Sequence, residues 1–230
     1  MISPTTIFYA LLGGVLPALF WLWFWLREDK LHPEPRRLIR KTFMLGMLSV
    51  IVVLPIQKGV ELLLPGSIFA AIILWAFFEE ILKFFAGYFG GLHSKADNEP
   101  VDPIIYMITA ALGFVALENA LFILGPLVSA DIPRSIVTGN LRFIGASLLH
   151  VVSSGLIGVA ISFTFYKPWV KAVTGAWAFV AAVLFHALFN LFIINFKTWG
   201  TPVSFIMVWL GVIFLLWAFE KAKSIVIPRM

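Results

Sequence analysis

Three ionisable residues interrupt the apolar stretch FFEEILKFF, at Glu79, Glu80 and Lys83. A charge at the centre of a bilayer costs about 2.5–3.5 kcal/mol on insertion scales, so such residues rarely face lipid. In a helix the three side chains would fall within an arc of about 100°. We therefore predict that they face the interior of a helical bundle. Lys83 is spaced to neutralise one carboxylate and to orient the other.

Three further residues of the same chemical types occur in other apolar stretches: Glu118 in GFVALENALF, His150 in SLLHVVSS and His186 in LFHALFN. Buried carboxylates and imidazoles can take a proton from water and stabilise an oxyanion. No serine or cysteine stands beside an evident base in a recognisable motif. The residues therefore favour hydrolysis by direct attack of water over a covalent nucleophile.

The composition indicates which elements must position these residues. Of 230 residues, 61% are hydrophobic and 13% are charged, and the mean hydropathy is +0.98. These values exclude an ordinary soluble domain, and apolar runs of about 17–25 residues are long enough to cross a bilayer as helices. We predict an all-α polytopic bundle, a single domain over residues 1–230, integral to the plasma membrane. The seven predicted spans are 5–26, 42–64, 68–89, 103–125, 140–166, 172–196 and 203–219.

Lys and Arg are distributed unevenly between the two sets of connections. The loops 27–41, 90–102 and 167–171 and the C-terminal tail hold twelve of them, whereas the opposite connections hold only Arg134 and Lys197. Because positive residues concentrate on the cytoplasmic side, this pattern predicts an external N-terminus and a cytoplasmic C-terminus. The lipid bilayer is one expected partner. The sequence has no basic patch with interleaved aromatics, so we expect no nucleic-acid partner.

With these directions, Glu79, Glu118, His150 and His186 lie within ~6 Å of one level, roughly 10 to 16 Å below the outer surface. Each could alone be a packed structural residue, but four helices delivering such groups to one layer favours a shared site. A proton-coupled transporter would use the same residue types, and an inactive scaffold that binds a partner helix is a further alternative. The chain has no repeat or matched pair of broken helices, which weighs against a transporter.

Five motifs occur in an order that resembles the PrsW family of intramembrane proteases and, more distantly, CAAX prenyl proteases and Abi-type membrane proteins. The motifs are HPEP (32–35), EEILK (79–83), DP with GFVALEN (102–103 and 113–119), RFIGASLLH (142–150) and HALFN (186–190). The family often has Glu-Pro-Glu-Pro at the first motif. The last motif can end in Asp where this chain has Asn190.

The resemblance implies cleavage of a peptide bond in or near a membrane span of a single-pass protein, in bacteria typically an anti-sigma factor. Glu79 or Glu80 would be the general base, and Asn190 could donate a hydrogen bond to the oxyanion. The residues that would hold water or metal are Glu118, His150 and His186. The supporting residues would be Lys83, Asn119 and Arg142.

The residues leave metal dependence open. Glu118, His150 and His186 make a two-histidine, one-carboxylate set of the kind that holds catalytic zinc with an open position. In the metal-free alternative a carboxylate activates water while the histidines and Asn190 bind the oxyanion. The two mechanisms are equally compatible with the sequence.

Two smaller expectations concern charges near the ends of spans. Asp102, just before Pro103, is predicted to be the N-cap of the fourth span. Lys58 and Glu61 are predicted to form an interfacial ion pair near the end of the second span.

Overall fold

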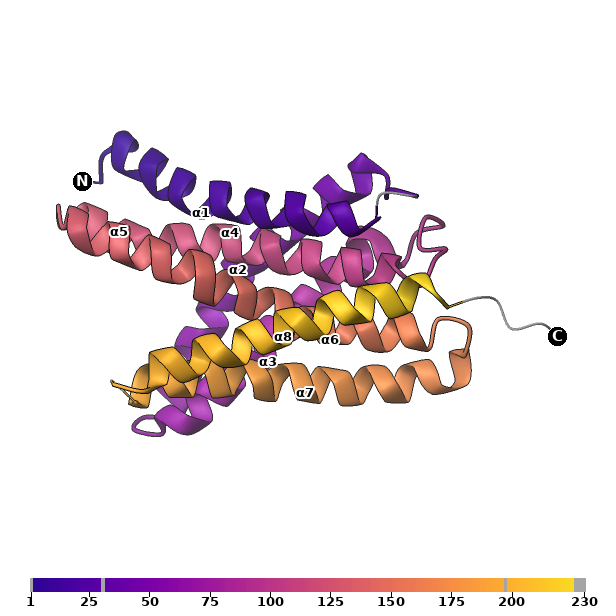
Figure 1. Cartoon of the computed structure of the whole chain (residues 1–230). Helices are drawn as coiled ribbons and strands as arrows, with labels where there is room; N and C mark the ends of the chain where they lie inside the picture. The colour runs from indigo at the N-terminus through magenta and orange to yellow at the C-terminus, as the bar shows by residue number, and fades with distance from the viewer. Residues whose placement is uncertain (1, 30–31, 197, 226–230) are drawn as a thin grey trace.

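The computed structural model describes residues 2–29, 32–196 and 198–225. The described residues form helices and contain no strand (Figure 1). The α-helices are α1 (Pro4–Leu26), α2 (Arg36–Leu63), α3 (Ile68–Gly87), α4 (Asp102–Val128), α5 (Ile132–Leu141), α6 (Ser147–Phe163), α7 (Pro168–Asn195) and α8 (Gly200–Lys223). A 3-10 turn, η1 (Arg27–Asp29), follows α1, and two π-helical turns, η2 (Tyr88–Leu92) and η3 (Arg142–Ala146), follow α3 and α5.

Segments α5, η3 and α6 run on without a break, so the chain has seven long helices in its described part. Six of them are long and apolar enough to cross a membrane. The exception is α3, which carries the charges of the EEILK motif. The prediction of an all-α, multi-pass membrane bundle is therefore confirmed.

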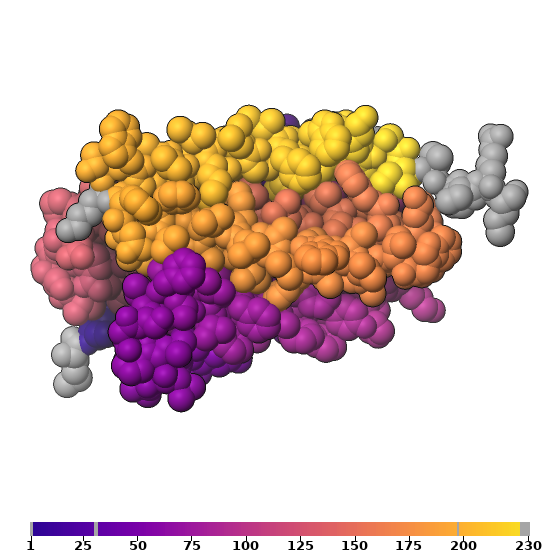
Figure 2. Space-filling model, turned by 90° about the horizontal axis from the view of Figure 1, so that it is seen from below, coloured from indigo at the N-terminus to yellow at the C-terminus, as the bar shows by residue number. Residues whose placement is uncertain are grey.

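The start of α1 and the end of α8 lie at opposite ends of the bundle (Figure 1). We call the end at which the described chain begins the N-terminal face and the opposite end the C-terminal face. The α2–α3 hairpin lies beside α7 near the N-terminal face (Figure 2). The connections that follow α1, α3 and α6 lie at the C-terminal face.

The largest differences from the predicted spans are at the starts of the fifth and the second, which both begin earlier in the structure. Helix α5 occupies most of the predicted connection before residue 140, because Asp131 accepts the backbone N–H of Arg134 (3.0 Å) and Pro133 lies in the first turn. Helix α2 begins at Arg36 rather than residue 42. The Arg and Lys residues that precede the apolar run are good helix formers, so the helix extends beyond the apolar segment.

The prediction that Asp102 is the N-cap of the fourth span is wrong. Helix α4 begins at Asp102 itself, with Val101 in the N-cap position. The Asp102 carboxylate instead accepts the backbone N–H groups of Asn98 (2.8 Å) and Glu99 (2.7 Å). It therefore fixes the loop before the helix.

Helix α4 is the centre of the bundle and packs against α1, α2 and α6. The crossing of α2 and α4 depends on Gly46 and Gly113. A Cβ on Gly46 would lie 2.2 Å from the Ala110 carbonyl oxygen, and one on Gly113 would lie 2.0 Å from that of Phe43. Only glycine allows the two backbones to approach this closely, and the approach brings α2 and α3 against the polar side of α4.

Candidate active site

The charged residues of α3 face the interior of the bundle, as predicted. Glu79 is 4% exposed, and Glu80 and Lys83 are fully buried. Phe77 and Phe85, on the other side of the helix, are exposed on the surface of the bundle. Helix α3 therefore has an aromatic outer face and a charged inner face.

Glu80 is held by hydrogen bonds from four side chains. Its Oε1 accepts from Lys83 Nζ (2.6 Å), His186 Nδ1 (2.7 Å) and Ser153 Oγ (2.8 Å), and its Oε2 accepts from Ser154 Oγ (2.9 Å). Both carboxylate oxygens are occupied, and the ammonium of Lys83 compensates the charge. Glu80 is thus a fixed acceptor with little capacity to take a further proton.

Glu79 differs from its neighbour in having a free oxygen. Its Oε1 accepts from Gln57 Nε2 (2.8 Å), whereas its Oε2 is buried and has no hydrogen-bond partner among the residues that the structure describes. His186 Nε2 lies 3.5 Å from this Oε2. A buried carboxylate oxygen without a donor is costly, so such an atom is a candidate for binding a proton, water or a metal ion.

The contacts of the two histidines assign their tautomers. In a neutral ring, donation from His186 Nδ1 to Glu80 leaves Nε2 as an acceptor directed toward Glu79. His150 Nδ1 accepts from Lys83 Nζ (2.8 Å), so Nε2 carries the proton and donates to Glu118 Oε2 (3.2 Å). The two rings contact each other edge to face, with centroids 4.9 Å apart.

Glu118 is bound by the guanidinium of Arg142 and by His150. Arg142 Nε also donates to the side-chain oxygen of Asn119 (2.5 Å), whose amide nitrogen donates to Ser147 (3.2 Å). Arg142 begins the π-helical turn η3, a type of distortion that is frequent at functional sites. The arginine therefore joins the carboxylate of α4 to the helix that carries His150.

A cavity of about 370 Å³ opens onto these residues. The predicted residues that line it are Glu79, Glu118, Arg142, His150, His186 and Asn190; Glu80, Lys83 and Asn119 lie behind this wall. Asn190 is one turn beyond His186 on α7 and is partly exposed. The cavity continues past Gln57 and Ile194 toward the N-terminal face.

The residues that sequence reasoning missed are Gln57, Ser153 and Ser154. Gln57 is an uncharged polar residue within the apolar second span, and it orients Glu79. Ser153 and Ser154 follow His150 by about one helical turn and complete the shell around Glu80. Two signals were available in the sequence. An amide such as Gln57 is rare within an apolar span, and the two serines follow His150 at a spacing that puts them on the same side of the helix.

The structure brings together a set of candidate metal donors that contains Glu79, whereas the predicted set contained Glu118. One donor atom from each of Glu79, His150 and His186 lies within 4.8 Å of the others. Neighbouring ligands in a tetrahedral zinc site are about 3.3 Å apart, close to the 3.5 Å between Glu79 Oε2 and His186 Nε2. To bind an ion through Nε2, the neutral His150 ring would have to take the tautomer protonated at Nδ1, so that Nδ1 no longer accepts from Lys83.

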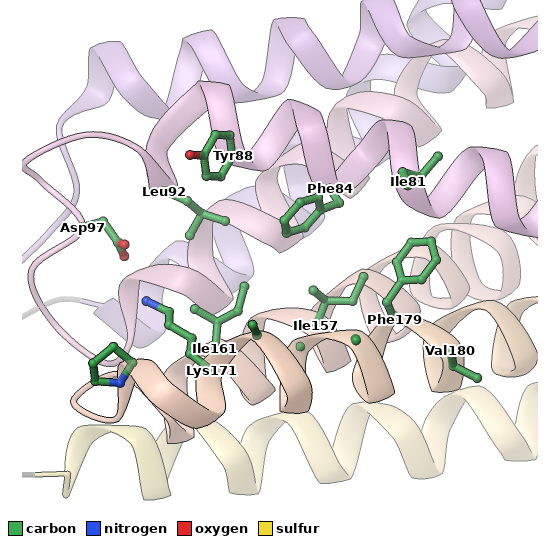
Figure 3. A pocket seen from close by; sticks show the side chains of 14 residues that line it. Ile81, Phe84, Tyr88, Leu92, Asp97, Ile157, Ile161, Lys171, Phe179 and Val180 are labelled. Carbon is green, nitrogen blue, oxygen red and sulfur yellow. The ribbon is translucent and has the colours of Figure 1, made fainter.

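A second, larger cavity of about 640 Å³ lies between α3, α6 and α7 (Figure 3). Its walls are mainly apolar, with Asp97 and Lys171 at the C-terminal face. Burial raises the pKa of Asp97 to about 7, against the opposing effect of Lys171. None of the predicted catalytic residues is among the described residues that line this cavity.

Fold and site together define a multi-pass membrane protein whose helices gather carboxylates and histidines around a cavity suited to water activation. Residues 34–218 match the PrsW family of intramembrane metalloproteases, and the chain belongs to this family. It is therefore an intramembrane protease, and the predicted resemblance is confirmed.

Several proteins named Protease PrsW are similar over most of their length. The chain is 27% identical to that of Geobacillus kaustophilus over 201 residues, which cover 85% of this chain and 84% of the relative. It is 26% identical to that of Bacillus subtilis over 218 residues, 93% of this chain and 95% of the relative. It is 29% identical to that of Oceanobacillus iheyensis over 206 residues, 88% and 91% of the two chains. No solved structure shows a significant match.

Proposed function

We propose that this chain, acting as a single domain, cleaves a peptide bond in or near the membrane span of a single-pass protein such as an anti-sigma factor. The observation that carries the proposed mechanism is the free Glu79 Oε2, buried 3.5 Å from the unprotonated Nε2 of His186. A water molecule between these two atoms would be positioned to lose a proton to Glu79. Family membership supports the peptide bond as the target.

The proposal gives Glu79 and Glu80 different roles. Glu79 is the general base, because one of its oxygens has no partner among the described residues and the residue lines the cavity. Glu80 is a positioning residue, because its hydrogen bond to Nδ1 fixes the ring orientation and tautomer of His186. Lys83 stabilises both Glu80 and the neutral tautomer of His150.

The tetrahedral intermediate needs hydrogen-bond donors for its oxyanion. The Asn190 amide is the candidate donor, since the residue lines the cavity; His150 Nε2–H also lies at the cavity but would have to turn from Glu118 to the oxyanion. Arg142 holds Glu118 as the acceptor that orients His150. These groups come from helices α4, α6 and α7, so the site depends on the packing of the whole bundle.

A bound metal ion would use the same atoms. We propose that Glu79, His150 and His186, rather than Glu118, His150 and His186, would hold it. Such an ion supplies a lowered pKa to its bound water and polarises the scissile carbonyl. Glu80, hydrogen-bonded to the far nitrogen of His186, would orient this ligand.

The proposed orientation places the N-terminal face, toward which the catalytic cavity extends, on the external side of the membrane. The support is the uneven distribution of Lys and Arg between the connections. Reporter fusions at Lys95 and Trp199 test it. We expect a cytoplasmic signal at Lys95 and an external one at Trp199, and the reverse at both positions would overturn the orientation.

The decisive test of the activity is proteolysis by the purified full chain with candidate single-pass substrates in detergent or vesicles. We expect cleavage by the wild type and its loss in Glu79→Ala, His150→Ala and His186→Ala, all with an intact thermal transition. Near wild-type cleavage in the three folded variants would overturn the assignment of the site. Glu220→Gln, on the surface of α8, is the matched control for loss of a carboxylate.

A further inference from the structure

A second cluster of carboxylates lies at the C-terminal face, around the start of α4. Asp29, Glu34 and Asp102 are 5%, 9% and 1% exposed, and one oxygen from each lies within 4.8 Å of the others. Asp102 precedes Glu118 by 16 residues of the same helix, which is about 24 Å along the helix axis. The cluster is therefore separate from the catalytic cavity.

Each carboxylate is held in place by donors from the surrounding chain. Asp29 Oδ2 accepts the backbone N–H of Glu34 (3.2 Å), and Glu34 accepts the hydroxyl of Tyr106. Asp102 uses Oδ2 for the backbone N–H groups of Asn98 and Glu99, and its carboxyl faces that of Glu34. The cluster thus joins the segment after α1, the segment before α2 and the first turn of α4.

The Asp102 carboxylate has an oxygen without a partner. Its Oδ1 is buried and accepts no hydrogen bond in the described part of the chain, and the carboxyl groups of Asp29 and Glu34 lie close to that of Asp102. Buried polar atoms in folded proteins normally have a partner, so this one points to a missing ligand. The missing ligand must be positive or a donor, since acceptors already surround the atom.

The charge of the cluster supports a cation. Within the residues that the structure describes, no Lys, Arg or His forms a salt bridge with Asp29, Glu34 or Asp102. His32, the nearby histidine, pairs with Glu99 instead (2.8 Å). The three carboxylates therefore have no compensating cation among the described residues.

We propose that Asp29, Glu34 and Asp102 bind a hard divalent cation, Ca²⁺ or Mg²⁺, at a site distinct from the catalytic one. A set composed only of oxygen ligands favours these ions over zinc or copper. The three oxygens lie within 4.8 Å of one another, and two ligands of one Ca²⁺ at bonds of about 2.3–2.6 Å can be no more than about 4.6–5.2 Å apart, so the three can share one ion with little movement.

The expected effect of the ion is to fasten the chain after α1 to the start of α4. Pro33 and Pro35 flank Glu34, and Pro103 follows Asp102. Each proline restricts the backbone, so the ligands are preorganised on a stiff frame. Ion binding would thus stabilise the C-terminal face without contacting the catalytic residues.

The test uses the full chain in detergent, stripped with EDTA and dialysed against Ca²⁺, Mg²⁺ or Zn²⁺, with bound metal measured by elemental analysis. We expect Ca²⁺ or Mg²⁺ to bind at one ion per chain, to raise the thermal midpoint, and to bind at least tenfold more weakly to Asp102→Asn and Glu34→Gln. The asparagine keeps an acceptor for the loop N–H groups, which favours folding of that variant. Zn²⁺ should not substitute at this site.

Two controls separate this site from its surroundings. Glu99→Gln removes a neighbouring carboxylate outside the cluster, and Glu79→Gln removes the free carboxylate of the catalytic cavity. Both should retain the Ca²⁺ or Mg²⁺ bound by the wild type. Absence of stoichiometric binding, or equal binding to wild type and Asp102→Asn, would overturn the proposal. A thermal midpoint that rises on acidification but not with either ion would show a proton-sharing cluster and would also overturn it.

Discussion

Glu79 and Glu80 are adjacent in the sequence, and we predict opposite consequences when each is changed to glutamine. Glu80→Gln removes the charge that compensates Lys83, and both side chains are fully buried. Breaking a buried ion pair by removing one partner costs about 3–5 kcal/mol. For a chain of this size each kcal/mol shifts the thermal midpoint by about 2–4 °C, so the midpoint should fall by about 6–20 °C.

Glu79→Gln leaves no buried cation without its partner, because Lys83 is paired with Glu80. The amide oxygen of the new side chain can still accept from Gln57, and its NH₂ can donate to the unprotonated Nε2 of His186. A neutral hydrogen bond contributes about 1 kcal/mol, so the thermal midpoint should be unchanged or slightly higher. Proteolysis should nevertheless fall by about 10²–10⁴-fold, the usual contribution of a general base.

The assay pairs thermal unfolding with cleavage of a reconstituted single-pass substrate. Intrinsic fluorescence suits the unfolding measurement, because the chain has nine tryptophans and no cysteine for thiol-reactive dyes. Glu220→Gln, which removes one partner of an exposed ion pair, should match the wild type in both measurements. A wild-type midpoint for Glu80→Gln, or near wild-type cleavage by Glu79→Gln, would refute the division of roles.

Three further predictions follow from the geometry. Proteolysis should disappear when a membrane-compatible chelator removes a catalytic metal and should return with zinc; activity that survives removal verified by elemental analysis would exclude the metal mechanism. Arg142→Lys should reduce proteolysis by about 10–100-fold without loss of the fold, because lysine cannot bind Glu118 and Asn119 at the same time as the guanidinium does. An unchanged cleavage rate would contradict this role of Arg142. The pKa of Asp97, which lies near Lys171 and Asp102, is raised in the folded state, so between about pH 4 and about pH 7 the folded state holds a proton that the unfolded state loses, and the contribution of Asp97 to stability falls as the pH rises. Over this range the thermal midpoint of Asp97→Asn should fall less than that of the wild type. Identical pH profiles of the two proteins would argue against this prediction.

The sequence was sufficient to predict the fold class and the face of α3 that carries charge. Charges in an apolar helix must avoid lipid, so their presence alone predicts that they face inward. The same reasoning could not predict that α5 continues into α6 through η3. That helix depends on the cap at Asp131 and on a π-helical turn, neither of which changes the hydropathy of the segment.

Contacts between helices were harder to predict than the faces of individual helices. The predicted ligand Glu118 is held by Arg142, and Glu79 occupies the position next to His186. In the sequence Glu34 stood out only as part of a family motif and Asp102 only as part of a motif and a predicted N-cap, and their proximity became evident from the structure. Such pairings depend on the rotation and depth of each helix, which a periodicity of 3.6 residues does not specify across different helices.

The charges of the site explain why one carboxylate remains available for chemistry. Three carboxylates surround the site, and the two permanent cations among them are each committed: Lys83 to Glu80 and Arg142 to Glu118. The histidine tautomers assigned above are neutral, so Glu79 is the one carboxylate of the three without a fixed counter-charge. A buried anion of this kind must bind a proton or a cation. The choice between a general base and a metal ligand is therefore a choice of what neutralises Glu79, and in either mechanism its free oxygen is the atom on which activity depends.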